Sequence, residues 1–173
     1  MTASSAALLP QDAPSIELEA PHHAAAVEAL VDRAFGPGRF AKSSERLRET
    51  NRKLDDCSFV ALRGGAVIGS VRLWPVTIGG KPAAFLGPLA VDSEQRSAGL
   101  GQALVEAACQ AATEAGWSAV LLVGDAPYFT RIGFSAAPAS KVLMPGPADQ
   151  RRVLLKALVP GGDEGFDGKV AVA

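Results

Sequence analysis

Two adjoining stretches decide the fold, LGPLAVD at residues 86–92 and SEQRSAGLG at residues 93–101. The first continues an apolar run from Ala83, as expected of a strand covered on both faces at the centre of a sheet. After the second, apolar residues recur with the spacing of a packed helix, at positions 100, 104, 107, 108, 111 and 115. The sequence therefore predicts a buried strand, an irregular turn and a helix that ends at Gly116.

The turn between this strand and this helix has the composition of an anion site. The first N–H groups of a helix have no intrahelical acceptor, and the positive end of the helix dipole lies beside them. Glycine is needed where a phosphate approaches the backbone closely, because a Cβ would obstruct it, and Gly99 and Gly101 stand there. With Arg96 as a mobile positive charge at the rim, the turn predicts a site for a diphosphate.

Two other phosphate-binding loops do not fit this turn. A P-loop places Lys and then Ser or Thr after its last glycine, whereas Gln102 and Ala103 follow here. A dinucleotide fingerprint requires a third glycine at position 104, which is Leu, and a βαβ start in place of the hairpins that precede this turn.

Upstream of the turn, the sequence predicts two helices and a meander of strands. A short strand at 16–18 precedes a helix at 22–35, and a second, charged, half-solvated helix is expected at 43–54. The runs 58–63 and 66–76 are separated by a glycine pair, which indicates a hairpin, and a second glycine pair leads into the central strand.

Downstream of the long helix, the pattern returns to short apolar runs. A buried strand is expected at 119–123, a short helix at 127–132, and the last strands from Phe134 onward and at 152–159. This order of antiparallel strands, helix, strand, helix and strands is that of an α+β, mixed α/β fold.

The composition narrows the classes of function. The chain has 173 residues, of which 48% are hydrophobic, as in one compact domain. With 17 Lys and Arg against 18 Asp and Glu, no global positive field attracts nucleic acid or a membrane surface. Two distant cysteines fit reduced thiols better than a disulfide, and no stretch resembles a signal peptide or a membrane span. We expect a cytoplasmic protein with a flexible tail at 1–14 and a single domain at 15–173.

Two motifs carry a resemblance to a known family. The pattern Arg96-x-x-Gly99-x-Gly101 resembles the signature of the Gcn5-related N-acetyltransferase (GNAT) family, in which Gln or Arg is followed by x-x-Gly-x-Gly or Ala. The segment GDAPYFTRIGF at 124–134 is similar to the family's next conserved block, and LVPG at 158–161 with DGKV at 167–170 resembles the YhbS-like branch. The resemblance spans about residues 16–170. Two motifs in the family's order are more specific than one Gly-x-Gly.

The resemblance implies a fold and a reaction. The expected fold is a central, mostly antiparallel sheet of six to seven strands with about four helices around it. The expected reaction transfers an acetyl group from acetyl-CoA to a primary amine of a small molecule or peptide, by direct attack in a ternary complex. Acetyl-CoA (coenzyme A) is the implied co-substrate, with no metal. Dimers are common in the family, so a homodimer is an alternative to the monomer.

The resemblance also implies how the cofactor binds. The pantetheine arm is expected to pair with the main chain of the strand at 88–91, and the amides of 97–102 are expected to hold the pyrophosphate. The N–H of Val91 is the candidate donor to the thioester carbonyl oxygen. The implied cofactor-binding residues are Leu89, Ala90, Val91, Arg96, Ser97, Ala98, Gly99, Leu100, Gly101, Gln102, Tyr128 and Phe129.

The chain departs from the family at the general acid. Relatives commonly carry a Tyr four residues before the glycine of their Gly-Phe pair, and here that position is Phe129. The neighbouring Tyr128 could protonate the departing thiolate if the short helix is rotated or shifted by one residue; otherwise Tyr128 packs or hydrogen-bonds structurally. The loss need not abolish turnover, because a thiol with a pKa of about 8.5 leaves readily as thiolate near neutral pH.

The acceptor end of the site is the least defined. Asp92, Glu94 and Glu45 are candidate general bases, with a chain of water as the alternative. Cationic side chains at 39, 42 and 46 could attract a substrate carboxylate, or form a solvated helix face. The two histidines, His22 and His23, lack the further ligands that a metal site needs.

Two other functions compete with acetyl transfer to an amine. One is a catalytically weakened CoA- or acyl-CoA-binding regulatory module, which Phe129 at the acid position would suit. The other is a transferase for a longer acyl chain, because the small residues at 87–91 do not decide the depth of the pocket.

Overall fold

A computed structural model describes residues 13–173, apart from the side chains of residue 41 and residues 96–98. Residues 1–12 of the expected tail therefore lie outside the described residues. The strands are β1 (Ser15–Leu18), β2 (Phe59–Arg63), β3 (Ala66–Ile78), β4 (Lys81–Val91), β5 (Ala119–Val123), β6 (Val142–Leu143), β7 (Val153–Ala157) and β8 (Gly168–Val172). The α-helices in the same part of the chain are α1 (Ala24–Phe35), α2 (Leu100–Glu114) and α3 (Ala126–Thr130).

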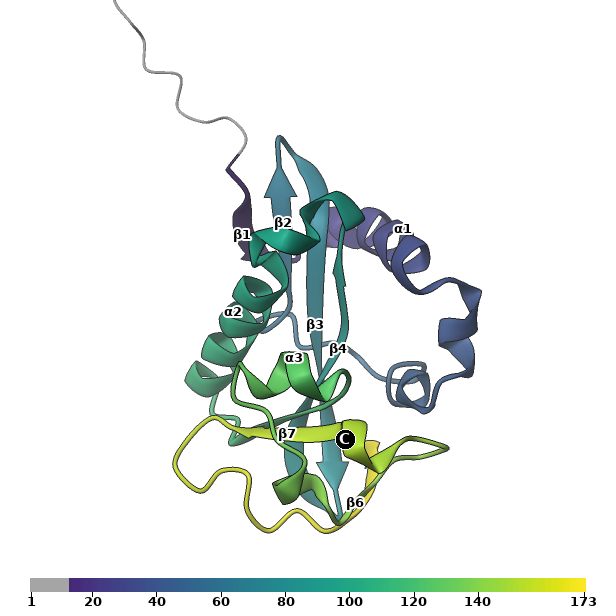
Figure 1. Ribbon diagram of the computed structural model, residues 1–173, viewed down its shortest axis with the longest axis vertical. Coiled ribbons are helices and arrows are strands. Elements are labelled where there is room, and N and C mark those ends of the chain that lie inside the picture. Colours follow the sequence, from purple (N-terminus) through teal and green to yellow (C-terminus); the bar gives the residue numbers. More distant parts are fainter. Residues whose placement is uncertain (1–12) are drawn as a thin grey trace, which may run out of the picture.

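The strands form one open, eight-stranded sheet of mixed α/β architecture (Figure 1). Its order is β1-β2-β3-β4-β5-β7, with β8 paired to β3 and β6. The pairs are antiparallel except for β4 with β5 and β6 with β8. The predicted fold class is confirmed, and the strand number exceeds the expected six to seven because the chain ends in β8 and its short partner β6.

The meander from β2 to β4 follows the glycine pairs. Gly64 and Gly65 connect β2 to β3, and Gly79 and Gly80 connect β3 to β4, all with positive φ between 55° and 85°. Two-residue hairpin turns of this hand need φ above zero at both central residues, which glycine adopts without steric cost. The predicted turns are therefore confirmed.

The helices α1 and α2 cover opposite faces of the sheet, and Figure 1 shows them on either side of β3 and β4. Successive strand residues point to opposite faces. On β2, Val60 packs in the cluster with α1, whereas Ala61 packs in the cluster with α2. The predicted boundaries of α2 and β5 are confirmed closely. Within the described residues no helix combines the length and apolar character that a membrane crossing requires.

The prediction of a charged helix at 43–54 is wrong. The segment forms two short 3-10 helices, η2 (Pro37–Ala41) and η3 (Ser43–Leu47), and then runs without regular structure to β2. The side chain of Asn51 donates to the carbonyl of Leu47, which an α-helix would reserve for a backbone N–H, and also to the carbonyl of Pro75. These contacts fix an irregular path against β3.

The last strands begin later than predicted. Phe134 is buried in the core without belonging to a strand, and Ser135 makes only an isolated bridge to Leu155. The strand predicted at 152–159 is present as β7, which pairs with all of β5.

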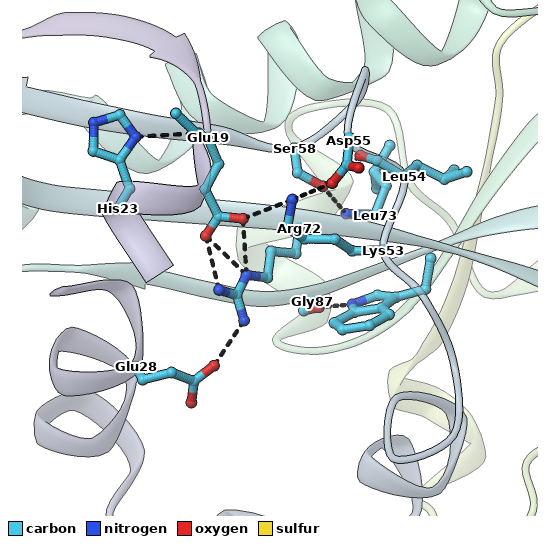
Figure 2. Close-up of polar contacts among 12 residues, drawn as sticks. Glu19, His23, Glu28, Lys53, Leu54, Asp55, Ser58, Arg72, Leu73 and Gly87 are labelled. Carbon is cyan, nitrogen blue, oxygen red and sulfur yellow. Dashed lines mark hydrogen bonds and ion pairs between the residues drawn. The ribbon is translucent and has the colours of Figure 1, made fainter. Parts of the chain in front are cut away.

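A chain of ion pairs ties α1 to β3 (Figure 2). The guanidinium of Arg72 contacts Glu19 through Nε and Nη2, and Glu28 of α1 through Nη1 at 2.7 Å. The Glu19 side chain is only 1% exposed, and Lys53 contacts it from its other side at 3.1 Å. Burial alone would raise the pKa of Glu28, but hydrogen bonds and charges from Arg72 and Arg39 outweigh burial and hold this pKa below its usual range. The pair of Glu28 with Arg72 therefore contributes stability near neutral pH that is lost as the pH falls through the pKa of the folded state.

Replacing Arg72 by methionine should destabilise the fold strongly. Arg72→Met leaves the buried Glu19 carboxylate with Lys53 alone, and breaking a buried pair in this way costs about 3–5 kcal/mol in the free energy of unfolding. The measurement is urea denaturation followed by circular dichroism, with Arg151→Met, which breaks an exposed ion pair, as the control that should keep the wild-type midpoint. Equal midpoints for the two variants would contradict the prediction.

Both cysteines are buried free thiols, in agreement with the expectation of reduced cysteines. Burial is the largest cause that raises the pKa of Cys57 to about 12, with a contribution from Asp56. Burial also raises the pKa of Cys109 to about 11. Since the thiolate is the reactive form, both side chains are held in the unreactive thiol form at neutral pH.

The thiols should react slowly in the folded protein. At pH 8 we expect maleimide labelling of Cys57 and Cys109 to be at least tenfold slower in buffer than in urea. Because the folded state keeps protons that the unfolded state releases, the free energy of unfolding should also fall as the pH rises above about 9. Labelling in buffer as fast as in urea would show that these sites are open.

Candidate active site

The strands β4 and β5 separate soon after they meet. They pair in parallel only at Ala84 with Val120 and at Phe85 with Leu121. Beyond these two positions β4 continues to Val91 beside β3, while β5 continues to Val123 beside β7. Among residues 13–173, therefore, no strand pairs with the second half of β4 on the β5 side.

A cavity of about 610 Å³ lies where the two strands separate. One wall is formed by β4 from Phe85 to Leu89, and another by the end of β5 with Tyr128 and Phe129 of α3. The remaining lining residues are Phe35, Arg39, Gly124, Asp125, the segments 42–45 and 147–149, Arg48 and Arg152. The cavity thus joins the open edge of β4 to the irregular segment that follows α1.

A bulge in β4 forms the wall next to this segment. On β3, Val71 pairs with Leu89 and Leu73 pairs with Leu86. Two residues of β4, Gly87 and Pro88, therefore lie opposite one residue of β3, Arg72. Gly87 has a φ of 146°, which a side chain would strain, and its carbonyl oxygen accepts a hydrogen bond from Trp74 Nε1. The glycine and the indole together fix the bulge.

The backbone after the bulge faces the open edge at alternate residues. The N–H of Asp92 donates to the carbonyl of Ile68 on β3 at 2.8 Å. In an antiparallel ladder every second residue points its main-chain groups to the same neighbour. Ala90 therefore also faces β3, and its side chain packs beneath α1. By the same alternation, Leu89 and Val91 direct their N–H and C=O groups to the open edge.

The predicted phosphate turn lies at the end of this edge. Asp92 caps the 3-10 helix η4 (Ser93–Ala98) by accepting from Glu94 N at 3.2 Å. Gly99 then adopts the left-handed conformation with a φ of 71°, and α2 begins at Leu100, whose side chain is buried in the core. The first backbone bond of the helix runs from Ala103 N to Gly99 O, so the N–H groups that precede Ala103 lie ahead of the intrahelical ladder.

The structure describes the side chains of only some of the predicted phosphate-binding residues in this turn. The side chains of Arg96, Ser97 and Ala98 lie outside the described part of the structure. Gln102 donates from its side chain to Glu106, one turn along α2, at 2.9 Å. Among the described groups of this turn, the main-chain N–H groups of Gly101 and Gln102 are the donors available to an anion.

Tyr128 and Phe129 point to different surroundings. The Tyr128 hydroxyl lies 2.8 Å from the position that a Cβ of Gly101 would occupy, against the first turn of α2. Burial raises the pKa of Tyr128 above its usual value. Phe129 is 9% exposed and packs edge-on against Phe134, with its ring on Gly124. The residue at the family's usual acid position thus packs into the core with one side on the cavity wall, whereas the adjacent tyrosine extends along the cavity to α2.

One of the three predicted candidate bases lines the cavity. Glu45 does, with a side chain 7% exposed and an oxygen 3.1 Å from Arg39 Nη1. Asp92 and Glu94 are not among the lining residues. Sequence reasoning missed two carboxylates that are, Asp125 and Asp149, whose positions depend on loops with no distinguishing pattern.

The predicted cationic side chains separate in the structure. Arg39 forms ion pairs with three carboxylates, those of Glu28, Asp32 and Glu45. Arg46 donates to the carbonyl of Pro145 and does not line the cavity, whereas Lys42 does. The sequence reasoning missed Arg48, which lines the cavity from the irregular segment after η3.

No metal cluster of three or more His, Cys, Asp or Glu side chains occurs among residues 13–173 as described. His23 Nδ1 accepts from the N–H of Ala20 at 3.0 Å just before α1, and His23 is not one of the cavity-lining residues. The side chains that do line the cavity suit a ligand bound by hydrogen bonds and main-chain groups.

Comparison with known proteins agrees with this geometry. Residues 24–134 match the Acetyltransferase (GNAT) family. The chain is 35% identical over 125 residues to the uncharacterized N-acetyltransferase YhbS of Escherichia coli K12, covering 70% of this chain and 74% of YhbS.

Two solved structures share the fold and contain the expected kind of ligand. The crystal structure of E. coli YhbS in complex with CoA superposes with a TM-score of 0.78 at 29% identity, covering 94% of this chain and 91% of that one. A Brucella melitensis GNAT family acetyltransferase in complex with acetyl-CoA gives a TM-score of 0.67 at 25% identity, covering 94% and 97%. The family match extends over more than half of the chain. By sequence and by fold, the chain therefore belongs to the GNAT family of acetyltransferases, as a homologue of YhbS.

Proposed function

We propose that this protein transfers the acetyl group of acetyl-CoA to a primary amine of a small molecule or peptide in the cytoplasm. The observation that carries the proposal is the open edge of β4, which runs from the cavity at the bulge to the first turn of α2. An extended pantetheine arm fits such an edge as an added strand, with its pyrophosphate at the helix N-terminus. The ligands of the two related structures, CoA and acetyl-CoA, support this proposal.

The direction of the cofactor follows from the two ends of the edge. With the pyrophosphate at the amides of residues 97–102, the thioester lies at the cavity end. Pro88 has no N–H, so the N–H of Leu89 is the first donor after the bulge, and Leu89 lines the cavity whereas Val91 does not. We therefore assign the carbonyl-oxygen donor to Leu89 and the pairing with the arm to Val91. The resemblance implies Val91 as the donor to the carbonyl oxygen, and Leu89 and Val91 together as the residues that pair with the arm.

The reaction in this arrangement is a direct aminolysis. A neutral amine attacks the thioester carbon, the N–C bond forms, and the oxyanion accepts the N–H of Leu89. The amine proton passes to a carboxylate of the cavity, directly or through water, and the C–S bond breaks. We assign the proton donor for the departing sulfur to Tyr128, whose hydroxyl has to turn from its position beside Gly101 toward the bulge end of the cavity for this step, and whose raised pKa keeps the proton in place near neutral pH.

One observation favours a second function, a CoA-binding module without turnover. Phe129 is buried at the position where relatives commonly carry the acid. Release of free thiol from acetyl-CoA across a panel of amines separates the two functions, because a binding module gives tight association and no release. Propionyl and longer thioesters as competing substrates test the preference for acetyl.

Gly99 should be essential for CoA binding in a way that Gly116 is not. Both residues have a left-handed φ, 71° and 93°, with nothing within 4 Å of an added Cβ, and they flank the two ends of α2. Alanine at either position should cost about 1–2 kcal/mol of stability. Only Gly99→Ala places a methyl group at the proposed pyrophosphate site, so we expect its Kd for CoA, measured by calorimetry, to rise at least tenfold. Equal affinities of Gly99→Ala and Gly116→Ala would refute the site.

Removing the Tyr128 hydroxyl should slow the chemical step. For Tyr128→Phe we expect kcat to fall about 10- to 100-fold, with the Kd for CoA within about threefold of wild type. Because the donor must be protonated and burial raises its pKa above about 10, the wild-type rate should decline only at higher pH than that. The variant should lack this alkaline decline. An unchanged kcat would assign Tyr128 a packing role.

A further inference from the structure

Arg48 is a buried cation with unused hydrogen-bond donors. Its side chain is 11% exposed and lines the cavity. Among the described residues its Nε is buried without a hydrogen-bond partner. The one hydrogen bond that Arg48 makes within residues 13–173 runs from Nη2 to Ser44 Oγ and is long, at 3.4 Å. The buried guanidinium of Arg48 therefore makes fewer hydrogen bonds than its donors allow.

The two neighbouring buried arginines differ from Arg48. All three nitrogens of Arg39 donate to carboxylates, those of Glu28, Asp32 and Glu45. All three nitrogens of Arg72 likewise donate to carboxylates. Glu45 Oε1 lies 3.1 Å from Arg39 but 3.6 Å from Arg48. The charge of Arg48 is thus the least neutralised of the three.

The energetics of burial make this arrangement unusual for a purely structural residue. A buried charge is costly unless it is paired and hydrogen-bonded. Burial is the largest cause that lowers the pKa of Arg48, and the nearby Glu45 only partly opposes it. An anion delivered by a ligand would supply the missing partner.

Arg48 also lies next to the place where the chemistry is proposed. Its Nη1 is 2.8 Å from the position that a Cβ of Gly87 would occupy, so the guanidinium rests on the β4 bulge. Gly87 is two residues from Leu89, which is about 7 Å along a strand. An anionic group on Arg48 and an amine at the thioester must therefore belong to one short molecule.

We propose that Arg48 binds the carboxylate of the acceptor, and that the acceptor is a small amino acid whose amine and carboxylate are separated by only a few bonds. This inference rests on the proposed acetyl transfer. The planar guanidinium matches a carboxylate with two parallel hydrogen bonds. A monoanion suits the site better than a phosphate dianion, because Glu45 already lies 3.6 Å from Arg48.

The test compares an amino acid with its carboxamide as acceptors. For the wild-type enzyme we expect kcat/KM for the acid to exceed that for the amide at least tenfold. Arg48→Met should raise KM for the acid at least tenfold, change kcat less than threefold, and leave the amide unaffected. Arg48→Lys should restore part of the preference, and Arg46→Met, whose guanidinium contacts Pro145 outside the cavity, should behave as wild type.

Calorimetry with the CoA complex gives a readout that does not need turnover. Wild-type protein should bind the acid and not the amide, Arg48→Met should bind neither, and all variants should bind CoA alike. If CoA binds and amines are acetylated without preference for the acid, or if Arg48→Met affects acid and amide equally, the assignment of Arg48 is overturned and the proposed function stands. If neither CoA nor acetyl transfer is detected in any variant, the proposed function itself fails.

Discussion

The divergence of β4 from β5 after two paired residues is the constraint on which the site depends. Main-chain N–H and C=O groups along a strand need partners, and β3 satisfies only every second residue of β4. The remaining groups face an edge that no strand of the described part of the chain covers. A ligand with amides of its own can pair with that edge. The irregular turn and the N-terminus of α2 lie at the end of the edge, so an anionic group of the same ligand can bind there.

The second organising feature is the chain of charges that runs from Lys53 through Arg72 to Arg39 and Arg48. It holds α1 against β3 and brings the segment after α1 over the β4 bulge. Each buried carboxylate in the chain is shared by two cations. The end of the chain that faces the cavity therefore carries positive charge, at the β4 bulge.

Local patterns were sufficient to predict the elements whose conformation depends on local chemistry. Glycine pairs fixed the hairpins, and apolar spacing fixed α2 and β5. The segment at 43–54 could not be predicted, because Asn51 bonds to Pro75, a residue 24 positions away, and no periodic signal records such a contact.

In the candidate site, too, the features that depend on local chemistry could be predicted from the sequence, and those that depend on long-range contacts could not. The orientation of Leu89 and Val91 follows from strand alternation once β4 is known, and the turn at Gly99 follows from its glycines. Which of Tyr128 and Phe129 reaches the first turn of α2 depends on the rotation of α3, which is set by Asp125 at its start and by the Phe129 ring on Gly124. Arg46 and Arg48 look alike in sequence, and only their long-range contacts, with Pro145 and with the bulge, distinguish them.

The hydrogen bond from Trp74 to the carbonyl of Gly87 has a spectroscopic consequence. The chain contains two tryptophans, so a variant with Trp117 replaced by phenylalanine would have Trp74 as its sole indole fluorophore. Its emission wavelength depends on the polarity around the ring and on the strength of this bond. Occupation of the cavity beside the β4 bulge would then be visible as a change in intrinsic fluorescence, without a label or a coupled assay.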